Sequence, residues 1–207
     1  CALPNGDLFE AIKQGSVSVV TGHINAFSEK GIKMQSGEEI DADIIITATG
    51  LKLQLLGGAS VRVDDKDIDL SETISYKGMM YSGVPNLINS FGYINASWTL
   101  RSDLIATWVC RLLNHMRAKE STTATPRIAG ELAESMSQRF WIDDFSAGYM
   151  QRVMHRFPKQ GDQMPWMNPQ NYRKDRKMFR DDPIEDEALT CERVAVATDV
   201  PALQEAS

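Results

Sequence analysis

Two stretches of the sequence combine residue types that could bind a small ligand. The first is DIIITATG at residues 43–50, in which three consecutive isoleucines occupy positions 44–46. A continuous β-branched run predicts a strand that is buried on both faces, as in a parallel sheet covered by helices. Ligands bind at the carboxyl ends of strands in such sheets, so Ala48, Thr49 and Gly50 are candidate binding residues. Many buried strands end in glycine, however, and this stretch alone does not specify a function.

The second stretch is GYINASWT, which follows an expected strand at 86–93 and begins a long helix. Its glycine permits a tight turn, and Asn95, Ser97 and Thr99 are candidate caps for the helix. The unpaired N–H groups at a helix start favour negative charge, so this end could accept an anionic group of a ligand. The candidate residues here are therefore Asn95, Ser97 and Thr99. The alternative is a helix that only caps itself.

No other arrangement in the sequence indicates a catalytic centre. His23, His115 and His155 are isolated, and none has a second metal ligand three or four residues away, so we expect no metal site. The GxSxG, HExxH and P-loop motifs are absent. Cys110 lies in the long helix and is expected to be a small core residue rather than a nucleophile. We assign no side chain the role of acid, base or nucleophile.

The long helix, expected from about residue 97 to residue 119, is the clearest element of the chain. Its apolar side chains recur at helical spacing and form one stripe, which should face the core. The stripe consists of Leu100, Leu104, Ile105, Trp108, Val109, Leu112, Leu113 and Met116. We expect Leu104, Trp108 and Leu112 to pack this helix against the sheet.

Shorter elements are expected before the long helix. The sequence predicts a helix at 7–14, a strand at 17–21 and a hairpin-like segment at 23–40 with turns around its glycines. A brief alternation of valines and an acidic turn follow within 61–69.

After the long helix, polar residues 121–126 are expected to form a linker. Two helical pieces, broken near 146–148, are expected between 130 and 156, followed by an irregular loop around Trp166.

The last part of the chain is strongly charged. A basic helix at 173–180 precedes an acidic stretch at 181–187, which favours a solvated, self-compensating face over an RNA-binding one. Residues after about 189 resemble a frayed terminus.

Length and composition exclude several classes of protein. The 207 residues carry a net charge of −6, with 43% hydrophobic residues, which is ordinary for a globular protein and argues against a nucleic-acid partner. No apolar run approaches the ~20 residues that span a bilayer. Three distant cysteines without a CxxC fit a reducing, cytoplasmic location. The chain starts at Cys1 in what reads as a loop, and we expect it to be a piece of a larger protein.

Several separated stretches together resemble one family. They are DADIIITATG, LKLQLLGG, KGMMYSGVPNLINSFGYINASWTLRSDLIATWVCRLLNHM, SAGYMQRVMHRFPKQGDQMPW and QNYRKD. In this order and spacing they are similar to the C-terminal part of class B flavoprotein monooxygenases of the Baeyer–Villiger type. The resemblance covers about residues 1–188.

The resemblance implies an α/β fold that is part of a glutathione-reductase-type, Rossmann-like architecture binding FAD and NADPH. Residues 1–50 would end the NADPH domain, with Ala48, Thr49 and Gly50 at the linker between cofactor domains. Residues 51–120 would form the returning, C-terminal portion of the FAD domain, with Asn95, Ser97, Trp98 and Thr99 facing the flavin. Residues 121–188 would lie near the substrate pocket, and 189–207 would be a flexible tail.

The implied reaction inserts one oxygen atom of O2 into a ketone or onto a sulfur-containing substrate. The family's GxGxxG loops and its FxGxxxHxxxW fingerprint are absent from this chain, so an N-terminal portion of the enzyme would be missing. We therefore expect the isolated chain to be inactive. The alternatives are part of an N- or S-hydroxylating flavin monooxygenase, or a non-catalytic binding module.

Overall fold

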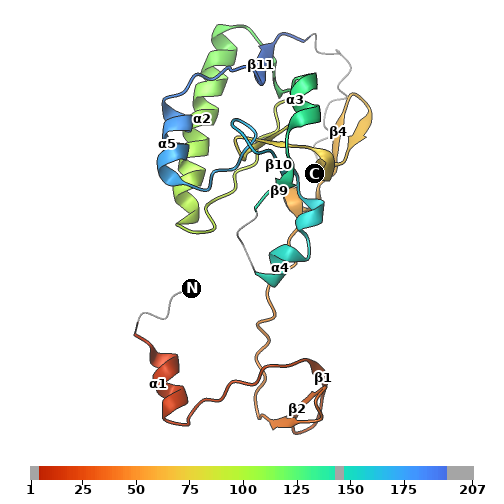
Figure 1. The fold of residues 1–207 in the computed structure, drawn as a ribbon, viewed down its shortest axis with the longest axis vertical. Coiled ribbons are helices and arrows are strands. Elements are labelled where there is room, and N and C mark those ends of the chain that lie inside the picture. The colour runs from red at the N-terminus through yellow and green to blue at the C-terminus, as the bar shows by residue number, and fades with distance from the viewer. Residues whose placement is uncertain (1–4, 143–146, 195–207) are drawn as a thin grey trace, which may run out of the picture. The chain divides into compact units, whose positions relative to one another are not determined.

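The computed structural model describes residues 5–142 and 147–194, and the chain divides into two compact units, Cys1–Gly50 and Leu51–Ser207. The first unit contains α1 (Asp7–Lys13) and a three-stranded antiparallel sheet (Figure 1). Its strands are β1 (Ile24–Phe27), β2 (Gly31–Met34) and β3 (Glu39–Asp41), joined by turns. The predicted helix and hairpin-like segment are both confirmed.

The predicted buried strand at 44–46 is wrong in this structure. Residues 43–50 belong to no strand, and Ile44 and Ile46 are 81% and 86% exposed. A strand buried on both faces needs a neighbour on each side, and none of the described residues pairs with this segment. The strand expected at 17–21 is also absent from the described chain for want of a pairing partner.

Helix α2 (Trp98–Ala118) organises the second unit and confirms the predicted long helix. Its buried face contains Leu104, Ile105, Trp108 and Leu112. The stripe is narrower than predicted, because Leu100 and Leu113 are 43% and 56% exposed. Cys110, expected in the core, is exposed as well.

The principal neighbour of α2 is another helix rather than a sheet. Helix α5 (Tyr172–Arg180) lies beside it (Figure 1). Met178 and Phe179 of α5 are buried in the same apolar cluster as Leu104 and Trp108. The expectation that α2 packs on a sheet is therefore corrected: its buried stripe is covered largely by the predicted basic helix.

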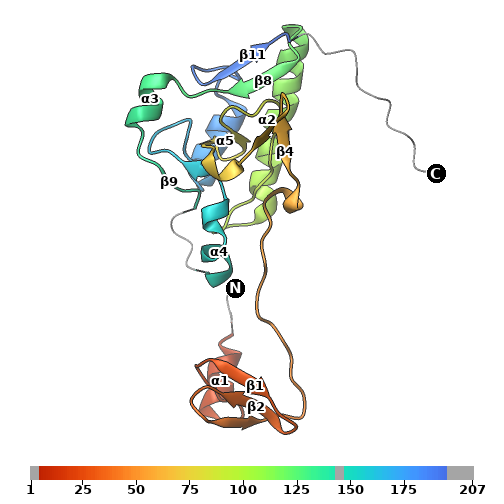
Figure 2. The same cartoon turned by 90° about the vertical axis from the view of Figure 1, so that its right-hand side faces the viewer.

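Two segments expected to be irregular form a sheet. Strand β8 (Thr123–Pro126) pairs antiparallel with β11 (Leu189–Glu192), as Figure 2 shows. Ala124 and Leu189 are fully buried. Residues 121–126 are thus no linker, and 189–192 do not begin a frayed tail. Conversely, residues 86–93, predicted as a strand, run without strand pairing.

The other described elements are short, and most sheets are two-stranded and antiparallel. The pairs are β4 (Val61–Val63) with β5 (Lys66–Ile68), β6 (Ser75–Tyr76) with β7 (Met80–Tyr81), and β9 (Arg139–Phe140) with β10 (Lys159–Gln160). Short helices are α3 (Gly130–Ser135) and α4 (Gly148–Gln151), with 3-10 turns at Leu55–Gly58, Leu70–Glu72 and Met154–Arg156. The described chain is a mixed α/β fold with small sheets.

The second unit contains two apolar clusters. The larger surrounds α2 and includes the buried side chain of Trp166, which lies in the irregular loop that the sequence predicts. The smaller contains Trp141, Met150 and Phe157. Across the described residues, no helix combines the length and apolar character needed to cross a membrane.

Candidate functional site

The loop that leads into α2 is held in place by one side chain from a distant part of the chain. The Ile94 backbone N–H donates to Gln170 Oε1 at 3.0 Å, and Gln170 Nε2 donates to the Gly92 carbonyl at 3.3 Å. Asn95 Nδ2 in turn donates to the Gln170 carbonyl at 3.2 Å. The candidate residue Asn95 therefore links this loop to the segment that precedes α5. It is not a helix cap.

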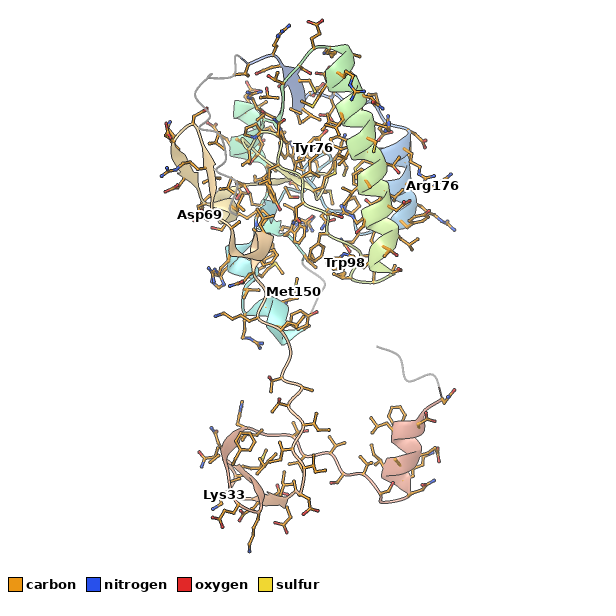
Figure 3. The ribbon with its side chains drawn as sticks, turned by 180° about the vertical axis from the view of Figure 1, so that it is seen from behind. Lys33, Asp69, Tyr76, Trp98, Met150 and Arg176 are labelled. Carbon is orange, nitrogen blue, oxygen red and sulfur yellow. The ribbon has the colours of Figure 1, made fainter. Side chains whose placement is uncertain are left out.

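Gly92 allows the chain to turn closely around Trp98. A Cβ atom at Gly92 would lie 2.4 Å from the Trp98 ring, so only glycine fits this approach. The Trp98 ring lies 4.5 Å from that of Phe91, and Phe91 contacts Trp141 edge-on at 4.4 Å. Trp98 is still 49% exposed, and Figure 3 shows it at the beginning of α2.

The first turn of α2 has no side-chain cap. Ser97 occupies the N-cap position, but its hydroxyl lies 3.0 Å from that of Thr99 instead of accepting from a backbone N–H. The prediction that Asn95, Ser97 or Thr99 caps the helix is wrong in this respect. The uncapped first turn leaves partial positive charge at this end of a 21-residue helix.

A buried arginine fixes the start of α2 against the rest of the unit. Arg101 Nε pairs with Asp175 Oδ2 of α5 at 3.2 Å, and both side chains are fully buried. The remaining guanidinium N–H groups donate to the carbonyls of Lys77, Gly78 and Phe91 at 3.0, 3.3 and 2.8 Å. Gly78, with φ +67°, has no side chain to block this approach, since a Cβ would lie 2.6 Å from Arg101 Nη2.

Burial opposes charge on both members of this pair. It lowers the pKa of Arg101 and raises the pKa of Asp175, while each partner's charge works against the shift of the other. Burial also raises the pKa of nearby Tyr93, and Asp175 adds to that shift. These groups thus anchor the elements, and nothing in their geometry makes them acids or bases.

A cavity of about 450 Å³ opens beside this anchor. One part of its wall is apolar and consists of Ile94, Trp141, Ile142, Met164 and Met167. The other part is polar and includes Asn95, Arg139, Asn168, Gln170 and Lys174. This size and mixture of walls are typical of a site for a small organic molecule.

The other predicted residues, Ala48, Thr49 and Gly50, lie at the end of the first unit. All three are exposed, and they belong to no strand. Gly50 has φ +88°, a conformation that suits glycine. The structure gathers Asn95, Ser97, Trp98 and Thr99 at the start of α2, whereas Ala48, Thr49 and Gly50 lie outside any helix or strand.

One group of side chains has metal-ligating atoms near one another. Atoms of His115, Glu185 and Cys191 lie within 4.8 Å of each other, although no sequence spacing indicated this. Glu185 is already bound by Lys119 Nζ at 2.5 Å. Burial, and then Glu185, raise the pKa of the Cys191 thiol to about 11, which keeps it protonated. We therefore interpret the group as an ion-pair cluster.

Sequence reasoning missed Gln170, Arg101 and Asp175, which position the site. The burial of Arg101 could have been predicted from its spacing, because it lies three residues before Leu104 and so falls on the apolar face of α2. No sequence pattern indicated the roles of Gln170 and Asp175, since their partners are more than 70 residues away along the chain.

Comparison with known proteins supports a flavoprotein relationship. The chain is 47% identical over 199 residues to the FAD-containing monooxygenase EthA of Mycolicibacterium smegmatis, which covers 95% of this chain and 40% of that protein. It is 46% identical to the putative FAD-containing monooxygenase MymA of Mycobacterium tuberculosis and 40% identical to the probable FAD-binding monooxygenase AlmA of Acinetobacter baylyi. These two matches each cover 91% of this chain and 38% and 37% of the relatives.

No family model matches the chain, and no solved structure matches it. The relationship therefore depends on the curated relatives, of which the chain spans about 40%. The resemblance to flavoprotein monooxygenases is confirmed, and over nearly its whole length this chain is homologous to part of the FAD-containing monooxygenases.

Proposed function

We propose that this chain is part of an FAD-containing monooxygenase. The observation that carries the proposal is the 47% identity over 199 residues with an enzyme of that name. The identity extends over both units of the chain. A short shared motif such as ATG would not produce identity of this extent.

The start of α2 suits the flavin of such an enzyme. Asn95, Ser97, Trp98 and Thr99 would hold it, because the uncapped first turn offers partial positive charge to an electron-rich edge. When bound and reduced, FAD supplies the electrons that activate O2. The chain's own residues contribute the charge at the helix start, the anchored loop and the aromatic wall around Trp98.

Ala48, Thr49 and Gly50 remain proposed residues of the linker between cofactor domains. The positive φ of Gly50 supports a close approach of backbone to a ligand. We further propose a glutathione-reductase-type architecture and NADPH as reductant. The substrate would be a ketone or a sulfur-containing molecule. The free thiols of Cys110 and Cys191 support a reducing, cytoplasmic location.

A chimera tests the proposal. In it, the matched 199 residues of the M. smegmatis relative are replaced by those of this chain. The chimera should oxidise NADPH in the presence of O2 and transfer oxygen to a ketone or a thioether. Product analysis with cyclohexanone and methyl phenyl sulfide separates ester formation from sulfoxide formation.

Ester formation would support the Baeyer–Villiger reaction, and sulfoxide alone would favour the heteroatom-oxidising alternative. A folded chimera that neither consumes NADPH nor forms either product would contradict the proposal. The unmodified relative serves as the positive control.

A further inference from the structure

The side chain of Gln170 takes the place of a neighbouring strand beside the segment that leads into α2. Residues 86–93 pair with no strand among the described residues, so the backbone groups on either side of Tyr93 need other partners. Gln170 Oε1 accepts from the Ile94 N–H at 3.0 Å, and Gln170 Nε2 donates to the Gly92 carbonyl at 3.3 Å. One amide thus supplies the acceptor and the donor that a strand would supply.

Gln170 is itself held at a defined place beside the two helices. Its φ of 48° lies in the left-handed region, which is uncommon for a residue with a side chain and persists only where surrounding contacts fix the backbone. Asn171, the next residue, caps α5 by accepting from the Lys174 N–H at 3.1 Å. Helix α5 lies beside α2 (Figure 1) and is joined to it by the buried pair of Arg101 and Asp175. The amide of Gln170 therefore extends from a firmly anchored part of the fold.

The loop that Gln170 holds determines where α2 begins. The backbone of Gly92 contacts Trp98, the first residue of α2, so closely that a Cβ at Gly92 would lie 2.7 Å from the Trp98 Cα. The Gln170 carbonyl also accepts from Asn95 Nδ2 at 3.2 Å, which holds the loop at a second point. A displacement of Gly92 would therefore displace the first turn of α2, together with the partial positive charge that no side-chain cap compensates.

Among side chains of its length, only that of glutamine satisfies all of these contacts. Gln170 Nε2 also donates to Asn168 Oδ1 at 3.3 Å, and Asn168 is buried. A carboxylate would place acceptors where the Gly92 carbonyl and Asn168 Oδ1 require a donor, and a thioether would offer no N–H at all. The hydrogen-bonding pattern of the amide, and not its bulk alone, therefore fixes the loop.

From these contacts we infer that Gln170 is a positioning residue for the flavin. Its amide holds the start of α2 where the positive end of the helix stabilises the negative charge that reduction brings to the flavin. The inference rests on the proposed function and deepens it, because it assigns part of the control of the reduction potential to a residue outside the proposed flavin wall. Gln170 transfers neither a proton nor an electron in this role.

Spectroelectrochemical titration of the flavin-loaded chimera with Gln170→Glu tests the inference. The ratio of the affinities for reduced and oxidised FAD should fall about tenfold, which lowers the potential by about 30 mV for a two-electron couple. The reason is that the Gly92 carbonyl loses its donor and a negative charge enters beside the loop. The difference from the unmodified chimera should shrink between pH 8 and pH 5.5, because protonation of the introduced carboxyl removes the charge and restores a donor.

Two further variants separate positioning from charge and from stability. Gln163→Glu is the matched control, because it adds the same charge at an exposed residue of the same loop, and it should change the affinity ratio less than about twofold. Gln170→Met removes the hydrogen bonds without adding charge and should lower the ratio about threefold at both pH values. Loss of stability alone would not change this ratio.

Gln170→Met decides the test if Gln170→Glu does not fold, with circular dichroism as the measure of folding. An unchanged ratio in Gln170→Met, or equal effects of Gln170→Glu and Gln163→Glu, would overturn the inference. Both results would leave the proposed function intact, since the chimera would still hold FAD. An unmodified chimera that folds without FAD would contradict the proposed function and the inference together.

Discussion

Arg101 of α2 joins three other segments of the chain, and its loss should be costly. It is fully buried, pairs with Asp175 and donates to three backbone carbonyls. Arg101→Met leaves the Asp175 charge and those carbonyls unpaired, so we expect a loss of about 3–5 kcal/mol in the free energy of unfolding. Urea denaturation followed by tryptophan fluorescence measures it.

Asp175→Leu provides the partner for a double-mutant cycle. Asp175→Leu should cost at least about 1 kcal/mol less in the Arg101→Met background than alone, because no buried charge is then newly stranded. Strictly additive losses would show that the two side chains do not interact energetically.

The lowered pKa of Glu185 predicts how the stability of the fold depends on pH in the acid range. The hydrogen bond from Lys119, followed by the Cys191 backbone N–H, lowers the pKa of Glu185 to about 2 from its usual 4.5. A lowered pKa in the folded state means that the contribution to stability is present above pH 4.5 and is lost as the pH falls toward 2.

Glu185→Gln should therefore flatten the fall in thermal midpoint between pH 5 and pH 2.5. Glu187→Gln is the control, because Glu187 is exposed and forms no ion pair with another described residue. An unchanged acid dependence in Glu185→Gln would rule out this contribution.

At the scale of elements, the proposed placement of the flavin at the start of α2 can be tested by its effect on the reduction potential. The Leu100 N–H donates to the Ser97 carbonyl at 3.2 Å, and Leu100→Pro removes that donor in a first turn that tolerates proline. In the flavin-loaded chimera, the reduction potential should fall by roughly 10–40 mV, since the reduced flavin loses part of its positive neighbour.

Spectroelectrochemical titration measures this shift, with Leu113→Ala as the control on an exposed side chain farther along α2. If the Leu100→Pro chimera folds and holds FAD at an unchanged potential, the start of α2 does not face the flavin.

Elements defined by local patterns were predictable, and those defined by distant partners were not. The period of apolar residues predicted α2, and glycine-containing turns predicted the sheet at 24–41. Strand β8 escaped prediction because its partner β11 lies more than 60 residues further along the chain. The prediction of a buried strand at 44–46 was wrong although the local pattern is strong. The three isoleucines have the composition of a central strand, but no strand among the described residues pairs with them.

The residues of the candidate site likewise divide into those that local sequence predicts and those that only tertiary contacts bring together. The sequence located the loop and helix start that carry Asn95, Ser97, Trp98 and Thr99. It could not locate Gln170 or Asn168, because these residues reach the cavity only through the tertiary fold.

At the scale of the whole molecule, the isolated chain should bind FAD weakly. The glycine-rich GxGxxG loop that contacts the pyrophosphate in dinucleotide-binding folds is absent from the sequence. Equilibrium dialysis of the 207-residue chain against FAD measures this binding. A yellow protein with stoichiometric FAD would contradict the expectation.

The FAD content of the purified chimera tests most directly whether this chain forms part of a flavin site. Its visible absorbance, compared with protein concentration and with far-ultraviolet circular dichroism, distinguishes a folded flavoprotein from a folded apoprotein. We predict a folded, yellow chimera with stoichiometric FAD, like the unmodified relative. A chimera that is folded but colourless, even after incubation with excess FAD, would contradict the assignment of this chain to an FAD-containing monooxygenase.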